Sequence, residues 1–226
     1  MLPLAFAAGL NEAANVLKEA VNRVVAAPEI AGTFAGARRP KKLRVRIAIL
    51  RDENGAPVAT EADVHPALDE AKRVLRERCA VELLPANGRW IETLEESAPK
   101  ESLDSPCAEG SWQADFGPGG AFFRRHHART TRGTLTGSAA PITAFVVRDV
   151  LGKAGCSLGP LVDYVTVDKR AFEGRTLRVL AHELGHACGL PHSDEAENLM
   201  LPKSMGERLR TWQVAVLRSS RHATYL

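Results

Sequence analysis

Three histidines and one glutamate stand close together between residues 182 and 192, and their types and spacing suit a metal site. His182 and His186 are four residues apart, so on a helix they share one face about one turn apart. Both imidazoles can then bind one zinc ion at roughly 2.0–2.1 Å. Gly189 can adopt the left-handed conformation that ends a helix, which would let the chain bring His192 to the same ion. Three protein ligands leave one zinc position open, as in catalytic sites.

Glu183 directly follows His182 and is therefore rotated about 100° around the helix axis from it. From there its carboxylate can accept a proton from a water that zinc activates, and can pass that proton to a leaving amine. Zinc would lower the pKa of the water to about 7 and would polarise the carbonyl under attack. These residues predict zinc-dependent hydrolysis of a peptide bond, with Glu183 as the general base.

Together these residues form the pattern H-E-x-x-H-x-x-G-x-x-H, which resembles the elongated zinc signature of the metzincin metallopeptidases. Metzincins place a methionine in a tight turn below the metal, and Met200 follows the third histidine at a suitable distance. Residues 192–202 are similar to the matrixin branch, whereas residues 155–160 are similar to the reprolysin-like branch. The choice between the two branches stays open.

The resemblance implies a zinc metallopeptidase, with Zn²⁺ as cofactor and a protein or peptide as substrate. It implies that the metal ligands are His182, His186 and His192, with Gly189 and Met200 as structural support of the site. It also favours a place outside the cell or in the cell envelope. The first ten residues nevertheless form a poor secretory signal, because no lysine or arginine precedes their apolar run. The sequence carries no counterpart of the family's cysteine switch, of the astacin-type tyrosine or of a calcium loop.

Two other functions are compatible with the same residues. One is a zinc amidase that acts on a non-protein amide, such as a cell-wall crosslink peptide. The other is a zinc-bearing module that binds peptides without cleaving them. The presence of Glu183 favours catalysis over simple binding, because a binding module needs no general base.

The elements that must position these residues follow from hydrophobic periodicity. It predicts strands at residues 43–50, 81–84, 142–147 and 162–168, and helices at residues 61–79, 176–188 and 206–219. The β-α-β opening favours a parallel pair of strands. The long polar stretch from residue 95 to residue 140 is expected to be a functional or disordered loop. With the resemblance, these elements predict a metzincin-like zincin of the α/β (α+β) class. It has a twisted mixed sheet, a long N-terminal helix, an active-site helix, a Met-turn and a C-terminal helix.

The N-terminal part has a different pattern. Residues 11–27 predict an amphipathic helix that Pro28 ends, with an apolar face made of Ala14, Leu17, Val21, Val24 and Val25. Residues 28–40 are expected to be a linker. We therefore divide the chain into an N-terminal helical appendage or linker, residues 1–40, and a zinc metallopeptidase catalytic domain, residues 41–226. The appendage is open to three interpretations: a pro-segment, a linker or a packing element.

The cysteines and the remaining histidines suggest supporting roles. Cys107 and Cys156 fall in predicted loops near the active segment, and a Cys107–Cys156 disulfide is favoured if the protein is exported. Cys79 and Cys188 lie on apolar helix faces and are expected to be small core residues. The adjacent histidines at positions 126 and 127 are expected to be exposed in a basic loop, without a metal.

Composition excludes several classes of protein. The chain has 226 residues, of which 25% are charged and 45% hydrophobic, which is typical of a globular domain with a real core. Its net charge of +3 is too small for a dedicated nucleic-acid binder. No apolar run approaches the roughly 20 residues that a membrane span needs. A monomer is favoured, although the sequence leaves the oligomeric state open.

Overall fold

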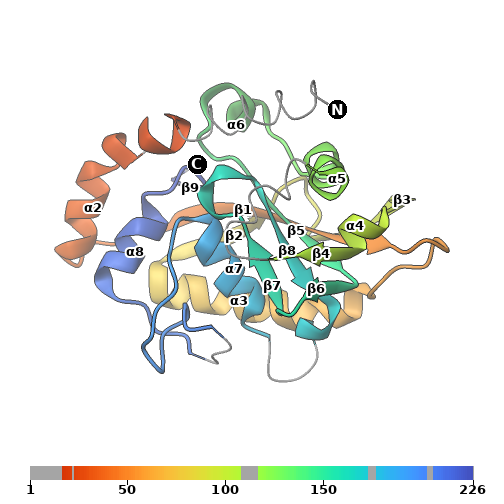
Figure 1. Cartoon of the computed structure of the whole chain (residues 1–226). Helices are drawn as coiled ribbons and strands as arrows, with labels where there is room; N and C mark the ends of the chain where they lie inside the picture. Colours follow the sequence, from red (N-terminus) through yellow and green to blue (C-terminus); the bar gives the residue numbers. More distant parts are fainter. Residues whose placement is uncertain (1–16, 22, 108–116, 173–176, 203–205, 226) are drawn as a thin grey trace.

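The computed structural model describes residues 17–21, 23–107, 117–172, 177–202 and 206–225 (Figure 1). The helices are α2 (Ala27–Phe34), α3 (Glu61–Cys79), α4 (Lys100–Leu103), α5 (Pro118–His126), α6 (Thr131–Thr136), α7 (Val179–Ala187) and α8 (Thr211–Arg218). The strands are β1 (Lys41–Arg51), β2 (Val81–Pro85), β3 (Ile91–Ser97), β4 (Asp104–Pro106), β5 (Ile142–Val147), β6 (Asp149–Leu151), β7 (Gly155–Ser157), β8 (Tyr164–Asp168) and β9 (Ala223–Thr224).

One mixed sheet organises the fold. Its strands follow the order β2-β1-β5-β8-β7, and β3 and β9 also pair with β1. The pairs β1–β2, β1–β3, β1–β5 and β5–β8 are parallel, whereas the edge strand β7 runs antiparallel to β8. Helices pack on both faces, so the predicted α/β class with a mixed sheet is confirmed.

The opening β-α-β unit forms where the sequence predicts it. In α3 the Thr60 hydroxyl accepts a hydrogen bond from the Asp63 amide, and the Asp63 carboxylate accepts one from the Thr60 amide. This capping box fixes the first turn. The helix ends at Ala80, whose φ of +51° turns the chain into the parallel strand β2. The buried side of the helix is the predicted one: Val64, Leu68, Ala71, Val74, Leu75 and Cys79.

Two apolar clusters cover the two faces of the sheet. The larger one joins the sheet to α3, α7 and α8, and it includes Leu184, Met200 and Leu217. The smaller one lies on the opposite face under α5, and it includes Phe123 and Phe145. Helix α7 therefore packs into the main core beside β7 and β8, as Figure 1 shows.

The N-terminal part differs from its prediction where a linker is expected. Residues 17–21 and 23–25 are helical as predicted, and the apolar residues Leu17, Val21, Val24 and Val25 are 53–76% exposed. Pro28 follows this helix but lies in the first turn of a second helix, α2, which occupies part of the predicted linker. Proline is well tolerated there because the first amide groups of a helix have no partner within it. Ala14 lies outside the described residues.

Three further predictions need correction. Residues 95–140 are not one long loop, because β3, α4, β4, α5 and α6 occupy much of the described part of this stretch. Gly117-Pro118 begins α5, whose buried Phe122 and Phe123 anchor it to the sheet. The last helix is shorter than predicted, and Trp212 on it is 40% exposed instead of facing inward. Among the described residues, no helix is long and apolar enough to cross a membrane.

Candidate metal centre

Helix α7 carries three of the candidate residues and ends at the predicted glycine. Its buried residues include the apolar Leu180, Ala181, Leu184 and Ala187. Gly189 has a φ of +93°, a left-handed conformation that L side chains rarely adopt. The Leu190 amide donates to the Gly185 carbonyl and the Gly189 amide to the His186 carbonyl. The turn thus caps the helix and redirects the chain toward His192.

The three histidines converge at one point. One potential ligand nitrogen from each of His182, His186 and His192 lies within 4.8 Å of the others. The Nε2 atoms of His182 and His186 are 3.0 Å apart. The side chains of these two residues are partly buried, whereas His192 is exposed. The sequence therefore predicts the convergence correctly, and one side of the cluster faces solvent.

The hydrogen bonds of the two helical histidines fit a metal ion. Nδ1 of His182 lies 2.7 Å from the Leu199 carbonyl, and Nδ1 of His186 lies 2.6 Å from the Leu190 carbonyl. A carbonyl only accepts, so each Nδ1 must carry the proton and each Nε2 a lone pair. Two lone pairs facing each other at 3.0 Å repel unless they share a cation. Tetrahedral zinc–imidazole bonds would hold such nitrogens roughly 3.3 Å apart, so the pair suits zinc.

Electrostatics favours the neutral, metal-binding form of these imidazoles. Burial lowers the pKa of His182, and it lowers the pKa of His186 to about 4, with His182 and His192 adding to the effect on His186. Both rings are therefore unprotonated at neutral pH. A ligand nitrogen must be unprotonated, so no proton has to be displaced before a metal binds.

The Glu183 side chain extends from α7 to the edge strand β7. Its side chain is almost fully buried, and the burial raises its pKa to about 8, against a smaller opposing effect of Lys153. A Cβ atom at position 155 would lie 2.7 Å from the Glu183 Cγ and Oε1 atoms. Only glycine at position 155 leaves room for this carboxylate. The sequence gives no signal for this contact, because Gly155 and Glu183 are distant in the chain.

Met200 is fully buried directly beneath the helix. A Cβ atom at position 185 would lie 2.7 Å from the Met200 Sδ atom, so Gly185 permits the close approach. The Met200 amide donates to Asn198 Oδ1 at 2.9 Å, and the Ser193 amide donates to the Met200 carbonyl at 3.0 Å. These two hydrogen bonds hold the turn at Met200 against Ser193, the residue after His192.

The cysteines fall into a bonded pair and two buried thiols. The predicted Cys107–Cys156 disulfide is confirmed, with Cα atoms 5.7 Å apart. It joins residue 107 to the strand β7 whose Gly155 contacts Glu183. Cys79 and Cys188 are buried free cysteines, as predicted, and burial raises the pKa of each thiol to about 12.

The other histidines show no comparable cluster among the described residues. His126 lies 3.0 Å from a Glu96 carboxylate oxygen, and its ring stacks on Phe122. His127 contacts the Arg124 carbonyl, and both histidines are half-buried instead of exposed as predicted. His222, close to the C-terminal end of the sequence, is buried with its Nδ1 atom 2.8 Å from the Ala140 carbonyl.

Comparisons with known proteins agree with this geometry. The family model of the matrixins matches residues 124–214, a segment that includes α7, the glycine turn and Met200. The resemblance to metzincin-type zinc metallopeptidases is therefore confirmed over the part of the chain that carries the site. No curated protein matches the chain as a whole or in part.

Several solved structures are similar in arrangement. Metalloproteinase-II from Bacteroides fragilis is 12% identical with a TM-score of 0.45, and the match covers 77% of this chain and 50% of that one. Archaemetzincin from Methanopyrus kandleri is 11% identical with a TM-score of 0.47, covering 78% and 94%. A zinc-dependent peptidase from Methanocorpusculum labreanum is 16% identical with a TM-score of 0.45, covering 76% and 99%. This chain thus aligns with about half of the first protein and nearly all of the other two.

Proposed function

We propose that this protein is a zinc-dependent metalloendopeptidase. The observation that carries the proposal is the cluster of three imidazole nitrogens within 4.8 Å, with the Glu183 carboxyl on the next residue of the same helix. The matrixin match over residues 124–214 supports the same class of enzyme. His182, His186 and His192 would hold the metal, and Met200 would support the helix from below.

Glu183 is the proposed general base and general acid of the reaction. Bound zinc would polarise the scissile carbonyl and lower the pKa of the attacking water. The positive charge of a bound zinc ion would favour the ionised form of Glu183 against the effect of burial. In that form Glu183 accepts a proton from this water as the water oxygen bonds to the carbonyl carbon. It then donates the proton to the amide nitrogen as the carbon–nitrogen bond breaks, which returns the carboxylate to its starting state. Its buried position next to Gly155 keeps the carboxyl fixed during both transfers.

The edge strand β7 is the proposed place for the substrate backbone. It is the last strand of the main sheet, and among the described residues it pairs on one side only, with β8. An extended peptide can add to such an edge through backbone hydrogen bonds. Because Gly155 of this strand contacts Glu183, a peptide held there would run past the proposed catalytic group.

The test is digestion of a complex peptide library by the zinc-loaded protein, with Glu183→Ala as control and products identified by mass spectrometry. Internal cleavages made only by the unaltered protein would support an endopeptidase and give its side-chain preference. If both proteins bind zinc and yield the same products, the endopeptidase proposal is wrong. A cell-wall crosslink peptide, supplied in parallel, would reveal the alternative amidase, and retention of peptides without cleavage would reveal a binding module.

We also propose that the protein works outside the cytoplasm or in the cell envelope. The support is the Cys107–Cys156 disulfide, since such bonds persist mainly in oxidising compartments. Alkylation of cellular protein before reduction checks this. Cys107 and Cys156 should resist the reagent, and their labelling in unreduced cells would contradict the proposal.

A further inference from the structure

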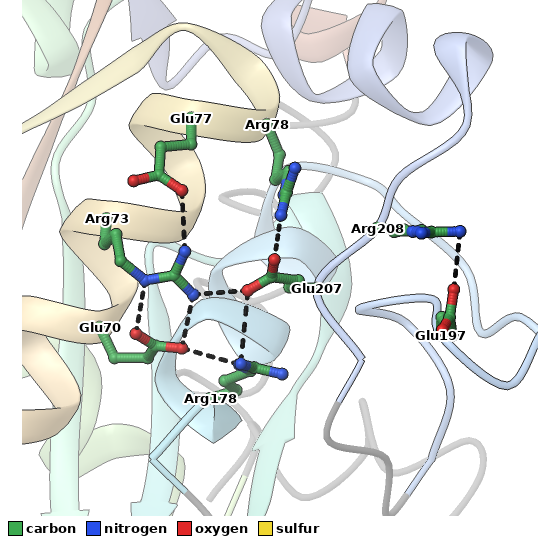
Figure 2. A network of polar contacts seen from close by, with 8 residues as sticks. All are labelled: Glu70, Arg73, Glu77, Arg78, Arg178, Glu197, Glu207 and Arg208. Atoms are coloured by element: carbon green, nitrogen blue, oxygen red, sulfur yellow. Dashed lines mark hydrogen bonds and ion pairs between the residues drawn. The ribbon is translucent and has the colours of Figure 1, made fainter.

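A network of ion pairs joins three parts of the molecule beside the active-site helix (Figure 2). Its members on α3 are Glu70, Arg73, Glu77 and Arg78. The others are Arg178, which directly precedes α7, and Glu207, which lies after the Met-turn. Arg73 bonds Glu70 through two atoms, both at 2.9 Å, and Arg178 Nε bonds the same carboxylate at 2.7 Å. The network thus connects the N-terminus of α7 to α3.

Glu207 is the member that ties the Met-turn segment to this network. One of its oxygens lies 2.5 Å from Arg73 Nη2 and 3.3 Å from Arg178 Nη2, and the other pairs with Arg78. Figure 2 shows these three arginines converging on the carboxylate. Hydrogen bonds from Arg73 and Arg78 hold the pKa of Glu207 below its usual range. Three guanidinium groups on one carboxylate restrain it more than an isolated surface pair would.

The backbone around Glu207 lies directly along the Met-turn segment. The Leu199 amide donates to the Arg208 carbonyl at 2.8 Å, and the Arg208 amide donates to the Glu197 carbonyl at 2.9 Å. A Cβ atom at position 206 would lie 2.4 Å from the Glu197 carbonyl carbon, so the two backbones touch. We call residues 206–208 and 197–199 the clasp. An ion pair between Glu197 and Arg208, also drawn in Figure 2, lies on its outer side.

The clasp contacts the first histidine of the candidate metal centre, His182. The Leu199 carbonyl, whose own amide is held by Arg208, accepts the hydrogen bond from Nδ1 of His182 at 2.7 Å. This bond fixes both the tautomer and the orientation of the ring. A continuous path therefore runs from the arginines through Glu207 and the clasp to His182.

We propose that Glu207 is a positioning residue for His182. Its ion pairs anchor residues 206–208 to Arg73 and Arg78 of α3 and to Arg178 beside α7. The anchored segment in turn holds the Leu199 carbonyl within hydrogen-bond distance of His182 Nδ1. The inference rests on the proposed zinc site, because the benefit of a fixed His182 ring is a fixed ligand. It adds to that site a distant carboxylate that touches neither metal nor substrate.

The test compares zinc release in Glu207→Gln with Glu77→Gln in the full-length protein. Glu77 bonds the same Arg73, at 2.8 Å, but has no contact with the clasp, so its variant is the matched control. Zinc loss to excess chelator should be roughly 3- to 10-fold faster in Glu207→Gln, somewhat below the usual effect of a residue that directly holds a metal ligand. Glu77→Gln should release zinc at the rate of the unaltered protein. The visible spectrum of the Co²⁺-substituted protein should shift only in Glu207→Gln.

Gly206→Ala provides a second variant that leaves every charge in place. Its added Cβ would push residues 206–208 away from Glu197, so it should also speed zinc release and shift the Co²⁺ spectrum. Equal release rates in Glu207→Gln and the unaltered protein, both zinc-loaded, would overturn the inference and leave the proposed function standing. Faster release in Glu77→Gln would also overturn it, because general loosening of α3 would then explain the effect. A chain that binds no zinc at all would overturn both proposals.

Discussion

Two backbone carbonyls determine which nitrogen of each helical histidine is available to a metal. Leu199 and Leu190 accept from the Nδ1 atoms of His182 and His186, which leaves the two Nε2 atoms facing each other. The histidines themselves can be predicted from the sequence, because their spacing on a helix is fixed by helix geometry. Their carbonyl partners cannot, because any residue type supplies a carbonyl and only the fold decides which one is near.

Gly155 provides a residue-scale test of the position of Glu183. In Gly155→Ala, the new Cβ would lie 2.7 Å from the glutamate Cγ and Oε1, so the carboxylate must move. We expect peptide hydrolysis to fall at least roughly 10-fold, as for other displaced catalytic groups. Zinc content should stay at that of the unaltered protein, because the three histidines of the cluster are left in place. Steady-state kinetics with metal analysis checks this, and unchanged turnover would contradict the assigned position of Glu183.

The buried His222 should make the free energy of unfolding depend on pH. Burial lowers its pKa to about 4, with Arg221 adding to the effect and Asp163 opposing it. The unfolded chain binds this proton near pH 6.5, so stability is present above that pH and is lost as the pH falls toward 4. Between pH 7 and pH 5 the loss should be about 2 kcal/mol.

Urea unfolding at the two pH values measures this loss. The difference in unfolding free energy between pH 7 and pH 5 should shrink in His222→Gln. An unchanged pH dependence in His222→Gln would show that this residue is not held neutral.

At the scale of elements, hydrophobic periodicity predicts the buried face of α3 but not that of the helical residues 17–21 and 23–25. For α3, the apolar face predicted from spacing is the buried one. In the N-terminal helix the polar side docks instead. Arg23 donates to the Val216 and Cys188 carbonyls at 2.7 and 3.0 Å, and Glu19 accepts from the Arg221 amide at 3.2 Å. Periodicity identifies the apolar face of a helix. It cannot tell whether the apolar or the polar face will pack against the domain, because the partners of the polar face are backbone groups far along the chain.

The Cys107–Cys156 disulfide should stabilise the protein and hold the edge strand β7 in place. Cys107 and Cys156 are separated by 49 positions, and a crosslink of that length stabilises a protein by roughly 2–4 kcal/mol. Cys107→Ser with Cys156→Ser should lower the unfolding free energy by that amount. It should also lower peptidase activity, because strand β7 then loses its anchor beside Glu183.

Urea unfolding with and without reductant measures the effect of the crosslink. Reductant should destabilise the unaltered protein and leave the double variant unchanged. Equal sensitivity of the two proteins to reductant would mean that the crosslink does not restrain the native chain.

At the scale of the whole molecule, the described N-terminal residues pack onto the catalytic part. Arg218 of α8 is fully buried, and its guanidinium bonds Glu29 at 2.6 Å, the Arg39 carbonyl at 2.7 Å and the Cys79 carbonyl at 2.7 Å. Of the three interpretations of residues 1–40, these contacts favour a packing element. The boundary at residue 40 remains a prediction.

Deleting residues 1–40 tests the packing interpretation. Arg218 would lose two of its partners while its charge stays buried, which should cost about 3–5 kcal/mol of unfolding free energy. Arg218→Met in the shortened chain removes the buried charge and should recover part of the loss. Chemical denaturation measures both. A shortened chain as stable as the full one would favour a separable appendage.

The proposed function depends above all on a catalytic zinc ion held by His182, His186 and His192 beside Glu183. X-ray absorption at the zinc edge, on protein shown by metal analysis to carry zinc, tests it most directly. We expect one zinc per chain, bound by three imidazole nitrogens and one oxygen ligand at roughly 2.0–2.1 Å. This spectrum should be lost in His186→Ala. A sulfur ligand, or zinc that stays bound in the same environment without His186, would contradict this assignment of the ligands.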